Sequence, residues 1–159
     1  MREIDEIDEI GWSILTELQR EGRVGFAELG RRVGLSAPAV AARVRRLEDD
    51  GVIEGYRAQL SFERLGLDVR AFVRMSAMGA MDIHDDLIEV ARGIPEVLDM
   101  WRVTGAETYI MRVAVRSVGD LERVLHPLWQ YGDTVTGVVM SHPIARRPID
   151  PVIVDPRRS

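Results

Sequence analysis

The chain has 159 residues, of which 46% are hydrophobic and 30% are charged, and it contains no cysteine. This apolar fraction is ample for a packed core and excludes intrinsic disorder, while the lack of cysteine excludes disulfides, thiol nucleophiles and thiolate metal sites. No apolar run approaches the roughly 20 residues of a membrane-spanning helix, and the acidic first ten residues do not resemble a signal peptide, so we expect a soluble cytoplasmic protein with no membrane partner.

The net charge of −5 is distributed unevenly along the first 47 residues. Residues 1–22 carry seven acidic residues and two arginines, whereas residues 23–47 carry six arginines and a single acidic residue, Glu28. A basic stretch on an otherwise acidic protein is typical of a surface that binds the phosphates of nucleic acids.

Three helices are predicted in the first fifty residues. Apolar residues at helical spacing predict a helix over residues 8–21 and a second helix over residues 26–33, each of which ends at a glycine. Ser36 is the predicted N-cap of a third helix, which Gly51 closes. On this third helix Val40, Val44 and Leu47 share one face. The residues predicted to point away from it are Ala39, Ala42, Arg43 and Arg46.

Residues 52–53 and 56–60 flank Glu54-Gly55, which is typical of a two-residue hairpin turn. Two short helices joined by a turn that contains glycine, followed by a hairpin, predict a winged helix-turn-helix domain over residues 1–60. A three-helix bundle whose arginine face is merely solvated would give the same pattern. The pattern alone favours neither interpretation.

Residues 61–68 are predicted to form a linker, and a second domain follows over residues 69–141. Strands are predicted over residues 69–75, 97–103, 109–115 and 135–140, and helices over residues 82–92 and 117–131. The order β-α-β-β-α-β is that of the ferredoxin-like α+β fold. Helices on one face of the sheet leave the other face for a second chain, and we expect Trp101, Met111 and Val113 there. Residues 142–159 contain four prolines and are predicted to form an extended tail that crosses onto a neighbouring chain.

Two segments, residues 7–60 and 94–115, resemble the Lrp/AsnC family, the feast/famine transcription regulators of bacteria and archaea. The matching motifs are Gly34-Leu35-Ser36, the run from Arg43 to Glu48, the run from Gly51 to Tyr56, and Pro95-Glu96-Val97 leading to Val103-Thr104-Gly105. The resemblance covers about residues 7–140. It implies a winged helix-turn-helix joined to an effector-sensing domain of the dimeric α+β barrel type. It also implies a homodimer formed through that domain, commonly four dimers in a ring, with an effector, usually an amino acid, between dimers.

The third helix would then enter the major groove of double-stranded DNA. The predicted DNA-binding residues are Ser36, Ala39, Ala42, Arg43, Arg45, Arg46 and Arg57. Arg45 is expected nearer the core side of the helix than Arg46. The alternatives are a solvated face, or arginines that pair within the helix with Glu48 and Asp49. The acidic residues 3–9 would repel DNA if they lay nearby, so we expect them to pack elsewhere or on a partner chain.

The effector would bind at the loop before the third strand. The predicted effector-binding residues are Thr104, Gly105, Ala106, Glu107, Thr108 and Tyr109. The family pattern has two aspartates here, and this sequence replaces both and has a carboxylate at Glu107. Glu107 would receive an ammonium group, and the amides around Gly105 a carboxylate. The alternative is an ordinary β-turn.

The sequence therefore predicts a sequence-specific transcriptional regulator whose DNA binding a small molecule modulates. The first alternative is an architectural DNA-binding protein without an effector response. Similar barrels also host small oxygenases and isomerases, but no catalytic constellation stands out, and the three histidines His84, His126 and His142 lie too far apart for a metal site. We expect neither an enzyme nor a bound cofactor.

Overall fold

The computed structural model describes residues 7–78 and 81–154, and it divides the chain into two compact units. One unit comprises residues 7–59 together with 144–154, and the other comprises residues 60–143. No helix in the described part of the chain is long and apolar enough to cross a membrane.

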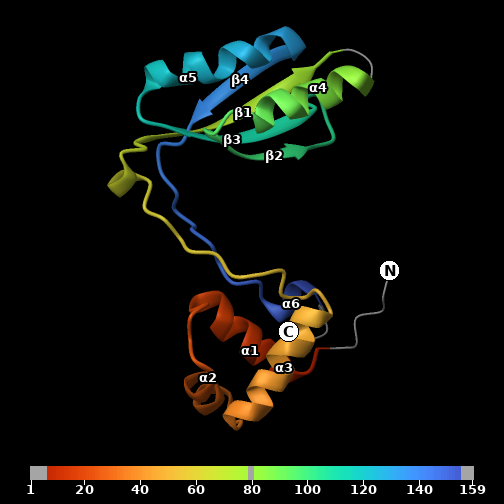
Figure 1. The fold of residues 1–159 in the computed structure, drawn as a ribbon, viewed down its shortest axis with the longest axis vertical. Coiled ribbons are helices and arrows are strands. Elements are labelled where there is room, and N and C mark those ends of the chain that lie inside the picture. Colours follow the sequence, from red (N-terminus) through yellow and green to blue (C-terminus); the bar gives the residue numbers. More distant parts are fainter. Residues whose placement is uncertain (1–6, 79–80, 155–159) are drawn as a thin grey trace. The chain divides into compact units, whose positions relative to one another are not determined.

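The first unit contains the predicted helix-turn-helix (Figure 1). Its helices are α1 (Glu9–Arg20), α2 (Phe26–Val33) and α3 (Ala37–Asp49). Gly34 ends α2 in the left-handed conformation, with φ of 73°, and Ser36 caps α3 by accepting a hydrogen bond from the Ala39 amide. A small core joins the helices, made of Ile14, Leu15, Leu29, Val40, Val44 and Leu47. The sequence prediction of these helices is confirmed to within two residues.

The predicted hairpin after α3 does not form, because residues 52–60 contain no strand. The amides of Val52 and Ile53 both donate to the Leu47 carbonyl, at 2.9 and 3.0 Å, and so they cap the end of α3. Amides used in this way cannot pair with a second strand, and an isolated two-stranded hairpin is marginally stable at best. The unit is therefore a helix-turn-helix in which the expected wing is an extended segment.

The second unit has the predicted order of strands and helices. Its elements are η1 (Glu63–Leu65), β1 (Val69–Ala77), α4 (Met81–Arg92), β2 (Val97–Arg102), β3 (Tyr109–Val115), α5 (Val118–Leu125), η2 (His126–Tyr131) and β4 (Gly132–Val138). The antiparallel sheet has the order β2-β3-β1-β4, which confirms the ferredoxin-like fold. The helix predicted over residues 117–131 divides into α5 and η2, since Pro127 cannot donate an α-helical hydrogen bond.

Both long helices of this unit cover the same face of the sheet (Figure 1). Met111 and Val113 are fully buried beneath them, together with Val73 and Met75 of β1. The expectation that Met111 and Val113 fill the uncovered face was therefore wrong. Trp101 does lie on the uncovered face and is 46% exposed, because it pairs with Ile110 in the register of β2 and β3.

The tail after β4 is only partly extended. Residues 151–154 form the short helix α6 (Pro151–Val154), and the segment 144–154 belongs to the same compact unit as α1, α2 and α3. The chain thus leaves this unit after residue 59 and returns to it at residue 144.

Candidate DNA interface and effector loop

The outward face of α3 carries the residues predicted to meet DNA. Ala42, Arg45 and Arg46 are exposed, and Ala39 is half-buried in the first turn. Arg45 and Arg46 both belong to the exposed class, so the expected position of Arg45 nearer the core was wrong. In the helical repeat, residues 45 and 46 flank the direction opposite to the buried face, one on each side. Two guanidinium groups and two small residues therefore share the outward face of α3.

Arg43 has a different environment from the other two arginines of α3. Its Nη1 donates to both carboxylate oxygens of Asp8, at 2.9 and 2.8 Å. The same carboxylate caps α1, since its Oδ1 accepts from the Gly11 amide at 2.7 Å. A Cβ at Gly11 would lie 2.8 Å from Ile7 Cγ2 and 3.1 Å from Asp8 Oδ1, so this position packs tightly against the two residues before α1. The partner of Arg43 is thus neither Glu48 nor Asp49.

This contact corrects the expectation that the acidic residues 3–9 pack away from the DNA-binding helix. Asp8, within that stretch, lies against Arg43 of α3. Residues 3–6 of that stretch lie outside the described part of the chain.

The two ends of α3 differ in charge. Its first turn has no acidic residue, whereas Glu48, Asp49 and Asp50 follow one another at its C-terminal end. Arg46 Nε lies 3.7 Å from Asp50 Oδ2, and the Tyr56 hydroxyl donates to Glu48 Oε1 at 3.0 Å. Burial and the Glu48 carboxylate raise the pKa of Tyr56. Anionic phosphates are consequently favoured near the N-terminal half of α3.

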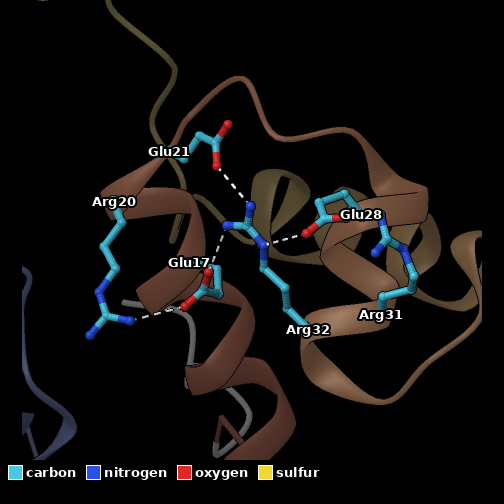
Figure 2. A network of polar contacts seen from close by, with 6 residues as sticks. All are labelled: Glu17, Arg20, Glu21, Glu28, Arg31 and Arg32. Atoms are coloured by element: carbon cyan, nitrogen blue, oxygen red, sulfur yellow. Dashed lines mark hydrogen bonds and ion pairs between the residues drawn. The ribbon is translucent and has the colours of Figure 1, made fainter.

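Arg31 and Arg32 of α2 belong to a network of ion pairs rather than to an open basic surface (Figure 2). The Arg32 guanidinium donates to Glu28, Glu17 and Glu21 at 2.9, 2.9 and 3.0 Å, and Arg31 also pairs with Glu28. Hydrogen bonds from Arg32 hold the pKa of Glu17 and of Glu28 below the ordinary range, and its carboxylate partners raise the pKa of Arg32. This network joins α2 to α1, so it fixes the first helix of the helix-turn-helix pair.

Arg57 lies on the extended segment that replaces the predicted wing. Its side chain is exposed and makes no ion pair with any other described residue. The geometry is compatible with contact to a phosphate beside the groove.

In the other unit, the predicted effector loop packs against the end of β1. The Thr108 amide donates to the Met75 carbonyl at 2.7 Å, and the Ser76 hydroxyl donates to the Ala106 carbonyl at 3.2 Å. Glu107 pairs with Arg74 of β1, with 3.1 Å between Oε1 and Nη1. Sequence reasoning missed Arg74. Its signal was the alternation along residues 69–75, which places Arg70, Phe72 and Arg74 opposite the buried face.

The six predicted effector residues do not form one cluster. Thr104, Gly105 and Ala106 are exposed, and Gly105 has φ of 123°, which favours glycine. Tyr109 instead is 2% exposed in the helix-covered core, where its hydroxyl lies 3.2 Å from His84 Nδ1 of α4. The loop therefore offers Glu107, Arg74 and main-chain groups as polar contacts, while the Tyr109 side chain anchors the following strand. Among residues 7–78 and 81–154, no group of side chains is arranged to hold a metal ion.

Comparisons with known proteins agree with this architecture. Residues 7–48 match the model of the AsnC-type helix-turn-helix domain, and residues 70–149 match that of the Lrp/AsnC ligand binding domain. Over 135 residues the chain is 38% identical to the HTH-type transcriptional regulator YezC of Bacillus subtilis, covering 85% of this chain and 94% of that protein. Over 118 residues it is 36% identical to the leucine-responsive regulatory protein of Rhizobium meliloti, covering 74% and 76%.

Two solved structures have similar folds over most of their length. The transcriptional regulator NMB0573 of Neisseria meningitidis, in complex with L-Met, aligns with a TM-score of 0.87 and 29% identity over 94% of this chain and 99% of that one. LrpC of Bacillus subtilis aligns with a TM-score of 0.82 and 30% identity over 89% and 99%.

Proposed function

This chain belongs to the Lrp/AsnC family of helix-turn-helix transcriptional regulators, and we propose that an amino acid bound at its effector loop modulates how it binds specific DNA sites. One observation carries the choice of effector class. Glu107 and Arg74 place a carboxylate and a guanidinium 3.1 Å apart beside the exposed residues 104–106. Such a pair is complementary to a zwitterion, whose ammonium would meet Glu107 and whose carboxylate would meet Arg74. The similar structure of NMB0573 in complex with L-Met supports the same class of ligand.

For the DNA contact we propose the exposed face of α3 with Arg57 as an additional phosphate contact. Ala39 and Ala42 let the helix approach the bases, and Arg45 and Arg46 reach base edges or phosphates. The Ser36 hydroxyl, which caps α3, lies at the end of the helix that favours a phosphate. Arg43, held by Asp8, contributes by fixing α3 against α1 rather than by reaching DNA directly.

We further propose that two chains pair through the uncovered face of the sheet, and that four such dimers assemble into a ring. Phe72, Trp101 and Val135 are 44%, 46% and 53% exposed on that face, and they belong to three different strands. Apolar side chains spread in this way across a face without helices are typical of an interface. Sedimentation of the full chain at tens of micromolar tests the pairing: Phe72→Glu should give a monomer where the unchanged chain sediments as a dimer or larger.

The effector is tested by titrating each of the twenty amino acids into a DNA-binding assay with the full chain. At least one should change the DNA affinity, and Glu107→Gln should reduce that change while leaving the affinity without amino acid unaltered. Coupling between such sites is typically about 1–3 kcal/mol, a change in Kd of about 5- to 150-fold. Glu122→Gln, a change of the same kind on the exposed face of α5, is the control and should retain the full response.

One observation favours a second candidate, an architectural DNA-binding protein that responds to no effector. Arg74 and Glu107 already neutralise each other, so the loop is electrostatically satisfied by the chain itself. In that case none of the twenty amino acids changes the DNA affinity, and the protein covers long DNA with little preference for sequence.

A further inference from the structure

The C-terminal segment 144–154 makes a specific contact with α1. The Gln19 side chain meets both main-chain polar groups of Ile149: its Oε1 accepts from the Ile149 amide at 2.8 Å, and its Nε2 donates to the Ile149 carbonyl at 3.5 Å. A neighbouring β-strand would satisfy an extended residue in the same two-sided way. Gln19 binds the main chain of Ile149 and not its side chain. The contact therefore fixes where the segment lies along α1.

After Ile149 the segment continues beside α1 and α2. Pro151, the first residue of α6, lines a groove together with Trp12 and Thr16 of α1 and Val33 of α2. The Asp150 side chain accepts from the Val152 amide at 3.0 Å, which supports the turn into α6. The segment thus has a defined conformation and a defined seat on the helix-turn-helix unit.

Within the other unit, the chain enters and leaves the sheet at one place. β1 begins at Val69 and β4 ends at Val138, which lies opposite Ala71, and the Val139 amide donates to the Arg70 carbonyl at 2.8 Å. The two connections to the helix-turn-helix unit therefore start from neighbouring residues. Arg74, the partner of Glu107, lies on the same strand as Arg70, four residues further along.

We propose that the segment 144–154 is a docking strap. Because it binds α1 of its own chain, it transmits a conformational change at the effector loop to the DNA-binding helices. A displacement of β1 by a ligand at Arg74 also displaces β4, because the two strands are hydrogen-bonded to each other. One connection reaches the helix-turn-helix unit after α3, and the strap reaches it at α1. With two connections, one after α3 and one at α1, a movement of β1 and β4 is passed on to the helix-turn-helix unit. A single flexible connection would let the two units move independently. The coupling role depends on the effector response proposed above, whereas the seat on α1 does not.

The seat is tested by hydrogen exchange of the full chain. In Gln19→Ala the Ile149 amide should exchange about five-fold faster, as expected for the loss of one hydrogen bond. Gln19→Glu keeps the acceptor for this amide but loses the donor to the carbonyl, so its exchange rate should be intermediate. Gln59→Ala, which changes an exposed glutamine of the same unit, should leave the rate unchanged. An Ile149 amide that exchanges equally fast in all four proteins overturns the proposal.

A cross-link shows whose α1 the strap occupies. The chain has no cysteine, so Gln19→Cys combined with Ile149→Cys offers a short bismaleimide only these two thiols. A cross-linked product of monomer size supports the proposal. A product of dimer size overturns it, because the segment would then sit on a second copy.

The coupling role is tested with L-methionine and the other amino acids in the DNA-binding assay. Gln19→Ala should reduce the amino-acid-induced change in Kd by at least about three-fold, with DNA affinity in the absence of amino acid and amino-acid affinity both retained. A full response in Gln19→Ala overturns the coupling role. If the chain without substitutions responds to no amino acid, the proposed function and the coupling role are both overturned. Slow exchange of the Ile149 amide would still show that the segment binds α1.

Discussion

Asp8 supplies one carboxylate for two purposes, and substitution can separate them. Its Oδ1 caps α1 through the Gly11 amide, and both oxygens accept from Arg43 of α3. Asp8→Asn keeps a side-chain oxygen that can cap a helix but removes the charge that holds Arg43. Asp8→Ala removes both interactions. The difference between the two variants therefore isolates the cap, and Asp8→Asn alone isolates the ion pair.

The structure sets the expected sizes of these effects. The Arg43 and Asp8 side chains are 40% and 52% exposed, so the pair is largely solvated and should contribute about 0.2–1 kcal/mol to the free energy of unfolding. Loss of the cap in Asp8→Ala should add about 1 kcal/mol, within the range of about 0.5–2 kcal/mol that is usual for N-caps. Urea denaturation of both variants measures the two quantities, with Asp133→Asn as a control at an exposed acidic residue of the other unit.

DNA binding should change in the opposite direction to stability. Asp8→Asn leaves the Arg43 guanidinium without this carboxylate, on the helix that approaches the DNA phosphates. We expect a Kd several-fold lower in Asp8→Asn and a salt dependence steeper by about one unit per protomer. Fluorescence anisotropy at several salt concentrations measures both. Weaker DNA binding in Asp8→Asn at unchanged salt dependence would refute this reasoning, since Asp8 would then be needed to position Arg43 for DNA.

Three further substitutions test the packing and the ion pairs. Leu29→Ala empties a fully buried position in the small core, and should lower the free energy of unfolding by about 2–5 kcal/mol in urea denaturation. Gly132→Ala places a Cβ 2.1 Å from a carbonyl oxygen of β1 at φ of 151°, and should cost at least about 2 kcal/mol by the same measurement. Because Arg32 lowers the pKa of Glu17 and Glu28 below their ordinary 4.5, their stabilisation is complete above that value and is lost as pH falls through the lowered pKa. The acid-side fall in Tm should therefore be shallower in Glu28→Gln than in the unchanged chain.

The helices and strands could be predicted from the sequence because their signals are local. Gly34 and Ser36 mark the turn between α2 and α3, and the alternation in residues 109–115 gives β3 its bounds. The hairpin prediction failed although Glu54-Gly55 is a good turn sequence. Its outcome depended on a competing use of the Val52 and Ile53 amides, which no pattern of side chains reveals.

The same holds for the candidate sites: features set by residues close in sequence could be predicted, and contacts between residues far apart in sequence could not. The exposed face of α3 follows from helical periodicity, so Arg46 could be placed correctly. The partners of Arg43 and Glu107 could not be predicted, because Asp8 and Arg74 lie 35 and 33 residues away in the chain. Tyr109 belongs to the effector motif by its neighbours in sequence, but strand alternation directs its side chain into the core.

The position of Trp101 depends on one extra residue in β2. Val97 pairs with Val113 and Asp99 pairs with Arg112, so Leu98 is the additional residue of a bulge. In an unbroken register Trp101 would stand opposite Tyr109, on the face that the helices cover, and Asp99 would stand opposite the buried Met111. A regular register that kept Leu98 would therefore exchange the two faces of the rest of this strand, removing an aromatic side chain from the outer surface and placing a carboxylate in the core, whereas deletion of Leu98 would remove the bulge and keep the pairs from Asp99 to Arg102. The bulge at Leu98 is thus what keeps the alternation of the last four residues of β2 in phase with β3, and we expect loss of a single residue to be tolerated at Leu98 but not between Asp99 and Arg102.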